Sequence, residues 1–409
     1  MHERVKEGLE WGKDLRINSN ITNMAASHLD RAKAAADNRN WSIAIDNRQQ
    51  LSIDQITHSE LVLDIALQVL IQGDFDQQWE IAKIIPKLGD IAVQPLLDLL
   101  NDTHIDPEDR WVVARILGEF DRPQVVTASI ELIQQQEDPE LTEIAISALT
   151  KIGVSAISAL TDLFATPNRH TAIATLAKIR HSKTIEPLIK VIDDPDPQLR
   201  SLVVEALGSF HDPRIPPLLI TKLTDVAATV RKAAVTALCL RSDLAAELDL
   251  SKHLRPLLFD LNLAVCQATA LGLARLPDRL NIEVLASVLS SPQTPIELQS
   301  SVILALGWIG TIPAIDSLMA AFPDVAPRLA PEIAIAIGKT DREQIYASQV
   351  LVNYLQGVDP SAAIIKQEIA TALGNLGNPD IVPDLVQLLK DPDDRVKLYT
   401  MNAISKLLK

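Results

Sequence analysis

Two tryptophan–cation pairs are the residues of this chain whose types and spacing best suit molecular recognition. Trp79 precedes Lys83 by four positions, and Trp111 precedes Arg115 by the same interval. Residues four apart on a helix lie on one face, so each ring is expected beside a cation. Binding hot spots favour Trp and Arg. We predict that these four residues form a partner-binding surface, and the alternative is that the tryptophans pack beneath an N-terminal helical cap.

The residue types that metal and nucleotide chemistry require do not occur at the necessary spacings. No phosphate-binding glycine motif and no H-E-x-x-H motif is present. The histidines are scattered, without the short intervals of metal ligands, at His2, His28, His58, His104, His170, His181, His211 and His253. We therefore expect no catalytic residue, no cofactor-binding residue and no metal site.

The two cysteines, Cys239 and Cys266, are predicted to be free thiols. In the repeat described below, Cys239 ends one helix, whereas Cys266 lies eight positions before the matching point of the next. That difference is an axial offset of about 12 Å at 1.5 Å per residue, too great for a disulfide. Cys266 is expected to be the more accessible thiol.

The elements that position these residues come from a recurring phrase: a small residue, then Leu or Ile, then an anchor that is often Gly. The anchors lie 27 to 36 residues apart, at Pro86, Gly118, Thr150, Ala177, Gly208, Cys239, Ala274, Gly307, Gly338, Gly374 and Ser405. A period near 32 residues suits two helices joined by short turns, as in an α-solenoid. We predict an all-α, right-handed superhelix of about eleven helix pairs that forms one continuous body.

Each period has a distinct first and second helix. The first begins around a Pro followed by aliphatic residues, as at Pro95, Pro187 and Pro383. Pro is tolerated there because the amide that it removes has no partner within the helix. The second helix, such as residues 198–208, is apolar at helical spacing, and eight of the eleven repeats have Ala or Gly two residues before the anchor. These small residues indicate places where two helix backbones approach closely.

An Asp in the turn, followed six positions later by a basic residue, marks several repeats. The pairs are Asp194 with Arg200, Asp225 with Arg231, and Asp391 with Lys397, whereas Asp260 is followed by Cys266. From residue 59 to the C-terminus the chain resembles HEAT repeats, and more narrowly the HEAT-like repeats of the E/F-type phycobilin lyases of cyanobacteria. The resemblance implies that the Asp and basic residues form an interrepeat ladder, interrupted at Cys266.

The resemblance also implies two functions. The chain is similar to lyase-like HEAT proteins that act as partners, including one that pairs with an A-type iron–sulfur scaffold protein. We favour a noncatalytic scaffold or assembly factor in iron–sulfur or photosynthetic complex biogenesis, whose partner is such a scaffold protein or a phycobiliprotein or photosystem component. The alternative is a phycobilin lyase or isomerase subunit with phycocyanobilin as its substrate. The lyases, however, carry several aromatics where this chain has only Trp111 among aliphatic residues.

The second helices line the concave face in HEAT proteins, which extends the candidate surface along the chain. The positions seven and three before each anchor share one stripe of the second helix. Farther along the chain this stripe becomes apolar at Leu271, Leu304 and Ile335. These three residues form a second candidate patch.

The sequence and its composition indicate how the chain is organised and which classes of partner it can bind. Residues 1–58 are expected to form an N-terminal extension and helical cap that includes Trp41, and residues 59–409 to form the solenoid. A net charge of −15 opposes binding to nucleic acid or anionic membranes, which both require a cationic field. No secretory signal opens the sequence. We expect a cytoplasmic protein with a protein partner, no nucleic-acid partner and no membrane insertion.

Overall fold

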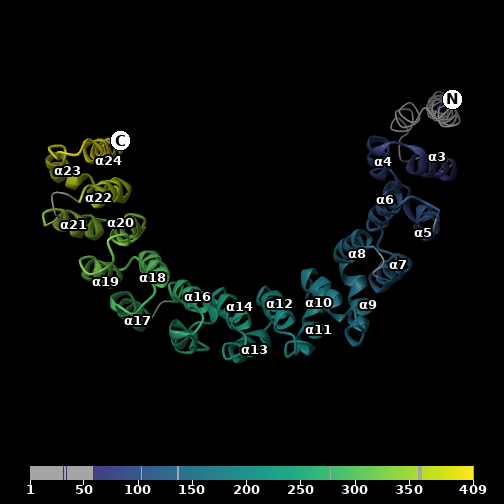
Figure 1. Cartoon of the computed structure of the whole chain (residues 1–409), viewed down its shortest axis with the longest axis horizontal. Coiled ribbons are helices and arrows are strands. Elements are labelled where there is room, and N and C mark those ends of the chain that lie inside the picture. Colours follow the sequence, from purple (N-terminus) through teal and green to yellow (C-terminus); the bar gives the residue numbers. More distant parts are fainter. Residues whose placement is uncertain are drawn as a thin grey trace, which may run out of the picture. The chain divides into compact units, whose positions relative to one another are not determined.

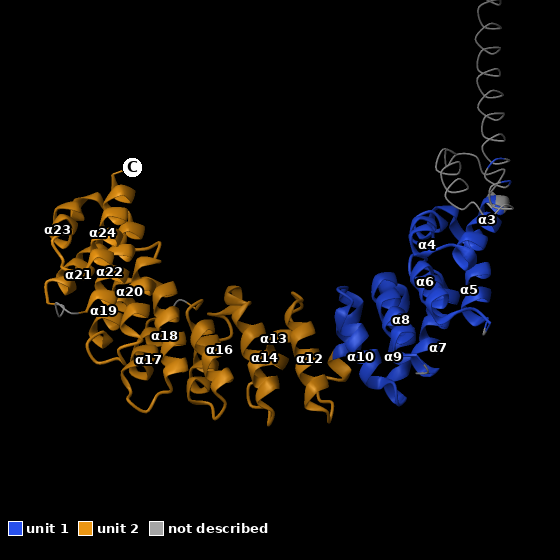
Figure 2. Cartoon of the chain, turned by 45° about the horizontal axis from the view of Figure 1, so that its top comes forward, with its two compact units in different colours: residues 1–188 blue, residues 189–409 orange. Residues whose placement is uncertain are grey.

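The computed structural model describes residues 59–408, apart from residues 103, 136–137, 277 and 358–361, together with Arg31 and Ala34. Apart from Arg31 and Ala34, residues 1–58, including Trp41 of the predicted cap, lie outside the described residues. The chain divides into two compact units, Met1–Leu188 and Ile189–Lys409 (Figure 2), where the sequence predicted a single body. Each unit is described by itself.

In unit 1 the described chain is a succession of helices along the sequence (Figure 1). Short 3-10 segments join several of them, and α11 (Ile185–Lys190) crosses the boundary between the units. The α-helices before it are α3 (Ser59–Gln72), α4 (Phe75–Ala82), α5 (Val93–Asn101), α6 (Pro107–Leu117), α7 (Pro123–Gln135), α8 (Pro139–Ile152), α9 (Ile157–Asp162) and α10 (Arg169–Lys178).

Unit 2 continues the same alternation of first and second helices. The second helices contact one another in sequence, α12 on α14, α14 on α16, α16 on α18, and so on to α24. The α-helices are α12 (Pro197–Gly208), α13 (Ile215–Lys222), α14 (Ala228–Cys239), α15 (Leu250–Leu254), α16 (Leu263–Leu273), α17 (Arg279–Ser290), α18 (Ile296–Ile309), α19 (Ile312–Ala321), α20 (Ala330–Gly338), α21 (Gln344–Leu355), α22 (Ala363–Leu376), α23 (Val382–Leu388) and α24 (Asp394–Leu407). The predicted all-α solenoid of about eleven helix pairs is confirmed; its handedness stays a prediction.

Helix starts follow the sequence signals. Pro95, Pro187 and Pro383 lie in the first turns of α5, α11 and α23, as predicted for first helices. The second helices α6, α8 and α12 begin with Asp followed by Pro. The Asp138 side chain accepts hydrogen bonds from the amides of residues 140 and 141 at 2.8 and 3.2 Å. A cap of this kind satisfies amides that have no partner within the helix.

Successive second helices are held close together by a contact between the anchor glycine and the small residue of the next repeat. A Cβ atom added at Gly208 would lie 2.4 Å from the Cβ of Ala237, and one added at Gly338 would lie 2.5 Å from the Cα of Ala372. The same contact occurs in both units, at Gly118 with Ala148, Gly208 with Ala237, Gly307 with Ala336, Gly338 with Ala372, and Gly374 with Ala403. The anchor glycine and the small residue two positions before the anchor, which recur from repeat to repeat, are therefore the two sides of one interface.

The contact between α14 and α16 exchanges these roles. The anchor is Cys239, and the position two residues before the next anchor is Gly272. A Cβ atom added at Gly272 would lie 2.1 Å from the Cys239 sulfur. The larger side chain has moved to the anchor, and the glycine opposite it keeps the helices close.

A buried charged ladder joins repeats in unit 2, as the resemblance implied. The Arg200 guanidinium donates two hydrogen bonds to the Asp225 carboxylate, at 2.8 and 2.7 Å, and a third to the carbonyl of Asp194 at 2.8 Å. Arg231 repeats this arrangement with the Asp260 carboxylate and the carbonyl of Asp225. Each rung thus ties one turn to the next.

The ladder ends at Cys266, at the predicted break. Its thiol donates to the carbonyl of Asp260 at 3.1 Å, which reproduces only the intrarepeat half of the rung. A further rung forms between Lys366 and Asp391 at 2.7 Å. Lys397 does not extend it, because its ammonium bonds Asp394 of its own helix at 2.8 Å.

One described helical segment, Pro139–Ala165, is long and apolar enough to cross a membrane by length and composition alone. Gly153, at a φ of 72°, ends α8 within this segment. Moreover, α8 packs against α6 and α7. These contacts make the segment part of the solenoid packing.

The glycine contact predicts a sharp difference between two Gly→Ala substitutions. Gly338→Ala should lower the free energy of unfolding by about 1 to 3 kcal/mol, because the methyl group overlaps Ala372 backbone atoms that cannot move freely. Gly357→Ala is the matched control, since its nearest neighbour is an ordinary 3.8 Å contact. Urea melts of both variants measure the difference. Equal stabilities for the two variants would contradict the proposed packing constraint.

The ladder predicts an acid-sensitive contribution to stability. Burial raises the pKa of the Asp225 carboxyl, but the Arg200 and Ala227 hydrogen bonds outweigh burial and leave the pKa below its usual 3.8. This stabilisation is present above the unfolded-state pKa and is lost as the pH falls through the lowered folded-state pKa. Asp225→Asn should destabilise the protein by roughly 3 kcal/mol near neutral pH, because it leaves the buried Arg200 unpaired.

The measurement is urea unfolding of the parent and Asp225→Asn from neutral pH down to about pH 3. The difference in unfolding free energy should shrink once the pH falls below about 4. The exposed Asp384→Asn is the control, with a small effect at every pH. A difference for Asp225→Asn that stays constant across the acid range would refute the role of the paired carboxylate.

Candidate functional site

The predicted stripe of the second helices is accessible. Of the positions seven and three before the anchor that the sequence singled out, none is buried: Trp79, Lys83, Trp111, Arg115, Gln267, Leu271, Ser300, Leu304, Pro331 and Ile335 are intermediate or exposed. Apolar residues at other positions of these helices, such as Ile81, Val113 and Leu117, supply the buried core. The stripe is therefore a surface whose side chains differ from repeat to repeat, apart from the glycine–alanine contacts that hold the second helices together.

In unit 1 the structure brings the four predicted residues together: Trp79 lies on α4, Lys83 is the C-cap of α4, and Trp111 and Arg115 lie on α6. The Arg115 guanidinium carbon lies 4.0 Å from the centre of the Trp79 ring and 5.7 Å from that of Trp111. Lys83 lies 6.0 Å from the Trp79 ring and forms an ion pair with Glu80 at 2.6 Å. Arg115 thus joins the tryptophans of two adjacent second helices, and we refer to Trp79, Lys83, Trp111, Arg115 and Phe75 as the Trp–Arg surface.

Phe75 is the member of this surface that the sequence analysis missed. Its ring lies 6.1 Å from that of Trp79, with an interplanar angle of 23°, and the residue is 68% exposed. The signal was available, since Phe75 precedes Trp79 by four positions and therefore shares its helix face. Trp79 itself is 39% exposed.

Trp111 serves both the fold and the surface. It is partly buried and packs against the hydrophobic core of unit 1, yet it also contacts the accessible Arg115. The predicted alternative, burial beneath an N-terminal cap, concerns residues outside those that the structure describes. For Trp111 the partial burial means that any test of binding needs a parallel test of stability.

An acidic pocket of about 540 Å³ borders this surface at the starts of α4, α6 and α8. Phe75 and Trp111 contribute to its walls, and no Lys or Arg lines it. Burial raises the pKa of the Asp109 carboxyl there, although a 2.6 Å hydrogen bond from the Gln78 amide opposes the shift. The carboxylates along the pocket are Asp74, Asp106, Glu108, Asp109, Asp138 and Glu140.

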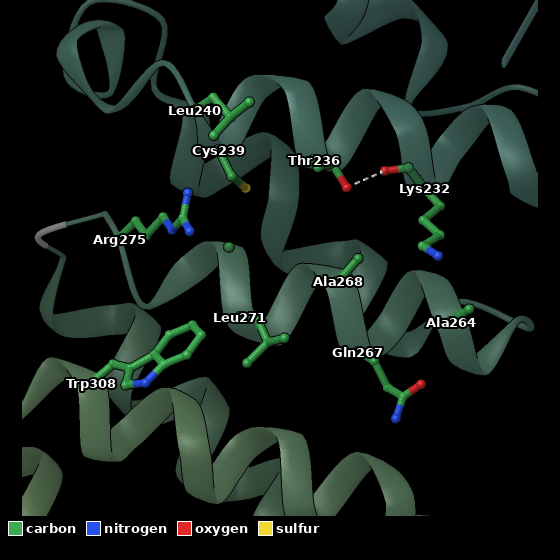
Figure 3. A pocket seen from close by; sticks show the side chains of 11 residues that line it. Lys232, Thr236, Cys239, Leu240, Ala264, Gln267, Ala268, Leu271, Arg275 and Trp308 are labelled. Carbon is green, nitrogen blue, oxygen red and sulfur yellow. Dashed lines mark hydrogen bonds between the residues drawn. The ribbon is translucent and has the colours of Figure 1, made fainter. Parts of the chain in front are cut away.

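In unit 2 a groove of about 400 Å³ lies along α14 and α16 and ends against α18 (Figure 3). We call it the α14–α16 groove. Its walls include Leu271 and Trp308, and its lining contains Lys232 and Arg275 but no carboxylate. Figure 3 shows Arg275, Leu240 and Trp308 towards one end and Lys232 at the other.

The second predicted patch is only partly gathered here. Leu271 lines the α14–α16 groove, whereas Leu304, which is 38% exposed, and Ile335 do not. The residues that the sequence analysis missed, Leu240, Arg275 and Trp308, each directly follow an anchor. Reading the position after the anchor across three successive repeats would have found them.

Both cysteines are free, as predicted, but both are buried. Cys239 contributes to the groove lining, and burial raises the pKa of its thiol to about 12 against a smaller opposing effect of Arg275. It is therefore protonated at neutral pH and is a poor nucleophile. The expectation that Cys266 is accessible was wrong, because its thiol turns inward to the carbonyl of Asp260.

No group of three or more His, Cys, Asp or Glu side chains within the described ranges is arranged to hold a metal ion. The Trp–Arg surface and the α14–α16 groove instead combine aromatic, aliphatic and cationic groups. Such combinations suit the binding of another molecule by contact and charge.

Comparison with known sequences identifies HEAT repeats in the chain. A family model of HEAT repeats matches residues 93–170 and 166–239, and a model of the PBS lyase HEAT-like repeat matches residues 365–391. Deoxyhypusine hydroxylase of Drosophila melanogaster is 29% identical over 111 residues, which make up 27% of this chain and 36% of the fly protein. The match thus spans about a third of that relative.

Solved structures support the same fold. Importin beta in an ammonium sulfate condition matches with a TM-score of 0.53 and 13% identity, over 93% of this chain and 62% of the importin chain. Kap121p matches with a TM-score of 0.52 and 16% identity, over 95% of this chain and 54% of that one. At such identities the likeness shows the fold alone. The chain is an all-helical HEAT-repeat solenoid, a fold typical of protein–protein interaction.

Proposed function

We propose that the protein is a noncatalytic scaffold or assembly factor that binds a protein partner through the Trp–Arg surface of unit 1. The observation that carries this proposal is the position of Arg115, 4.0 Å from the Trp79 ring and 5.7 Å from the Trp111 ring, at an accessible face. Three aromatic side chains and two cations on adjacent helices make a dense set of groups that binding hot spots favour.

Preorganisation supports a role in binding. Cation–π contacts at exposed sites contribute only about 0.5 to 1 kcal/mol each, so they are modest sources of fold stability. They nevertheless hold Arg115 and Trp79 in defined positions before a partner arrives. Less side-chain entropy is then lost on association, and the partner meets a surface already in its binding geometry.

We place the function in iron–sulfur or photosynthetic complex biogenesis in a cyanobacterium-like cytoplasm. The partner in this proposal is an A-type iron–sulfur scaffold protein or a phycobiliprotein or photosystem component. The resemblance to lyase-like HEAT proteins that act as partners supports it, together with the PBS lyase HEAT-like match at residues 365–391. The net charge of −15 disfavours nucleic acid as an alternative partner.

Replacing Trp111 and Arg115 by Ala should weaken partner binding by more than about 1 kcal/mol for each residue, because both are candidate hot spots. The partner is first identified by affinity isolation and mass spectrometry, and its dissociation constant is then measured for each variant by titration calorimetry. Lys87→Ala, at an exposed residue outside the Trp–Arg surface, is the control and should bind as the parent does.

Circular dichroism and a thermal melt accompany each variant, because Trp111 packs against the core. Arg115→Ala separates the two roles, since Arg115 is exposed and its loss removes contacts only from the surface. If the Arg115→Ala variant and the Trp111→Ala/Arg115→Ala double variant are both folded and both retain the parent affinity, the Trp–Arg surface is not the partner-binding site.

The alternative function is a phycobilin lyase or isomerase subunit, which the match to a PBS lyase HEAT-like repeat favours. Under this alternative, phycocyanobilin is the substrate. Incubating the purified protein with phycocyanobilin, with and without a candidate phycobiliprotein, should produce no protein-bound, red-shifted absorption band if the scaffold proposal is correct. A stable band that transfers to the phycobiliprotein would establish the lyase function instead.

A further inference from the structure

The α14–α16 groove carries an unusual charge for this protein. Lys232 and Arg275 line it, both are exposed, and neither forms an ion pair with any described residue. The groove lining contains no carboxylate, although the chain as a whole has a net charge of −15. Two unpaired cations in a concave, mostly apolar setting are positioned for carboxylates that this part of the chain does not supply.

The walls of the groove carry large apolar side chains, whereas its floor carries small ones. Trp308 is 50% exposed and Leu240 is 58% exposed, and both rise beside the groove with Leu271. The open floor consists of Ala264 and Ala268, one turn apart on one face of α16, whereas Gly272 on the same face is buried against the Cys239 side chain. The two alanines span about 6 Å at 1.5 Å per residue, so a helix can approach α16 closely along this turn.

We propose that the α14–α16 groove docks an acidic amphipathic helix of a partner protein. Two carboxylates on that helix, separated by two turns, pair with Lys232 and Arg275. Apolar side chains of that helix contact Leu271 between the two cations, and Leu240 and Trp308 at the end that holds Arg275. The occupant is thus defined by charge complementarity at both ends and by apolar contacts along the groove.

The separation of the cations sets the spacing of the carboxylates. Lys232 and Cys239 lie seven positions apart on α14, which is about 10.5 Å along its axis, and Arg275 lies near enough to Cys239 to oppose the effect of burial on the pKa of its thiol. Carboxylates at positions i and i+7 of a helix are about 10.5 Å apart along its axis, and residues i+3 and i+4 lie on the same face between them. Salt largely screens the interaction of a bound helix with charged residues farther away than the Debye length, which is about 8 Å at physiological ionic strength. The two cations of the groove therefore dominate the charge that the helix meets.

This inference goes beyond the proposed function and uses a different surface. The Trp–Arg surface belongs to unit 1, whereas every residue of the α14–α16 groove belongs to unit 2. Either can fail without the other. Arg115→Ala therefore provides a control that should leave binding at the groove unchanged.

The probe is a fluorescein-labelled, alanine-based helical peptide of about 20 residues, a length at which such helices form in water. It carries Glu at i and i+7 and Leu at i+3 and i+4. A matched peptide replaces both Glu residues by Lys. Fluorescence anisotropy with the full-length protein should show saturable binding of the Glu peptide and binding about tenfold or more weaker for the Lys peptide.

A charge exchange in the protein tests the pairing directly. The double substitution Lys232→Glu and Arg275→Glu should weaken the Glu peptide by about tenfold or more and should strengthen the Lys peptide. Lys252→Glu with Lys339→Glu makes the same change in net charge at exposed residues outside the groove and should leave the order of the two peptides unchanged. Trp308→Ala should weaken both peptides, and circular dichroism confirms that each variant is folded.

The proposal is overturned if the Glu peptide does not bind saturably, if the two peptides bind equally well, or if the charge exchange fails to reverse their order. It is also overturned if light scattering shows self-association that Trp308→Ala abolishes, because the groove would then hold a second copy of this chain.

Discussion

The close approach of successive second helices is the constraint on which the rest of the structure depends. At five interfaces an anchor glycine lies against an alanine of the next repeat, with no room for a further methyl group. This distance lets the Leu and Ile side chains beside the glycine and alanine pack to high density in the core. It also forces larger side chains of the second helix onto the opposite, accessible stripe, which is where Trp79 and Arg115 are found.

Recognition chemistry in such a fold varies independently of the core. The same stripe carries aromatic rings and cations in unit 1. In unit 2 it borders a mostly apolar groove whose two cations form no ion pair with any residue that the structure describes. The two surfaces differ because the stripe residues do not take part in the glycine–alanine contacts that set the distance between helices. A solenoid can thus offer chemically different surfaces along one chain while its packing rules stay the same.

The sequence predicted the packing better than it predicted the surfaces. The spacing of anchors and the small residue two positions earlier defined the helix pairs, because that spacing is imposed by the close contact itself. The break of the ladder at Cys266 was also predictable, since a thiol cannot replace a bidentate guanidinium. The sequence analysis did not recognise the exchange between Cys239 and Gly272. In this pair the larger residue is at the anchor and the glycine is in the next repeat, so the pair is recognised only when two repeats are compared.

The surfaces were harder to predict for physical reasons. The four-residue spacing placed Trp79 and Lys83 on one face, but the contact of Arg115 with Trp79 depends on the distance between α4 and α6 and on side-chain rotamers. The α14–α16 groove draws on three helices, and its lining follows from how they pack. Leu304 and Ile335 share the predicted stripe yet lie outside that groove, since sequence position alone does not specify which repeats form a concavity.

Site-specific photo-crosslinking in cells tests the central claim, that the stripe of the second helices is the recognition surface, most directly. A photo-reactive amino acid at position 83 lies on the Trp–Arg surface, and one at the exposed position 94 lies on the first helix α5. The account predicts a discrete covalent adduct with one protein from position 83 and none from position 94. An adduct from position 94 alone, or equal adducts from both positions, would contradict it.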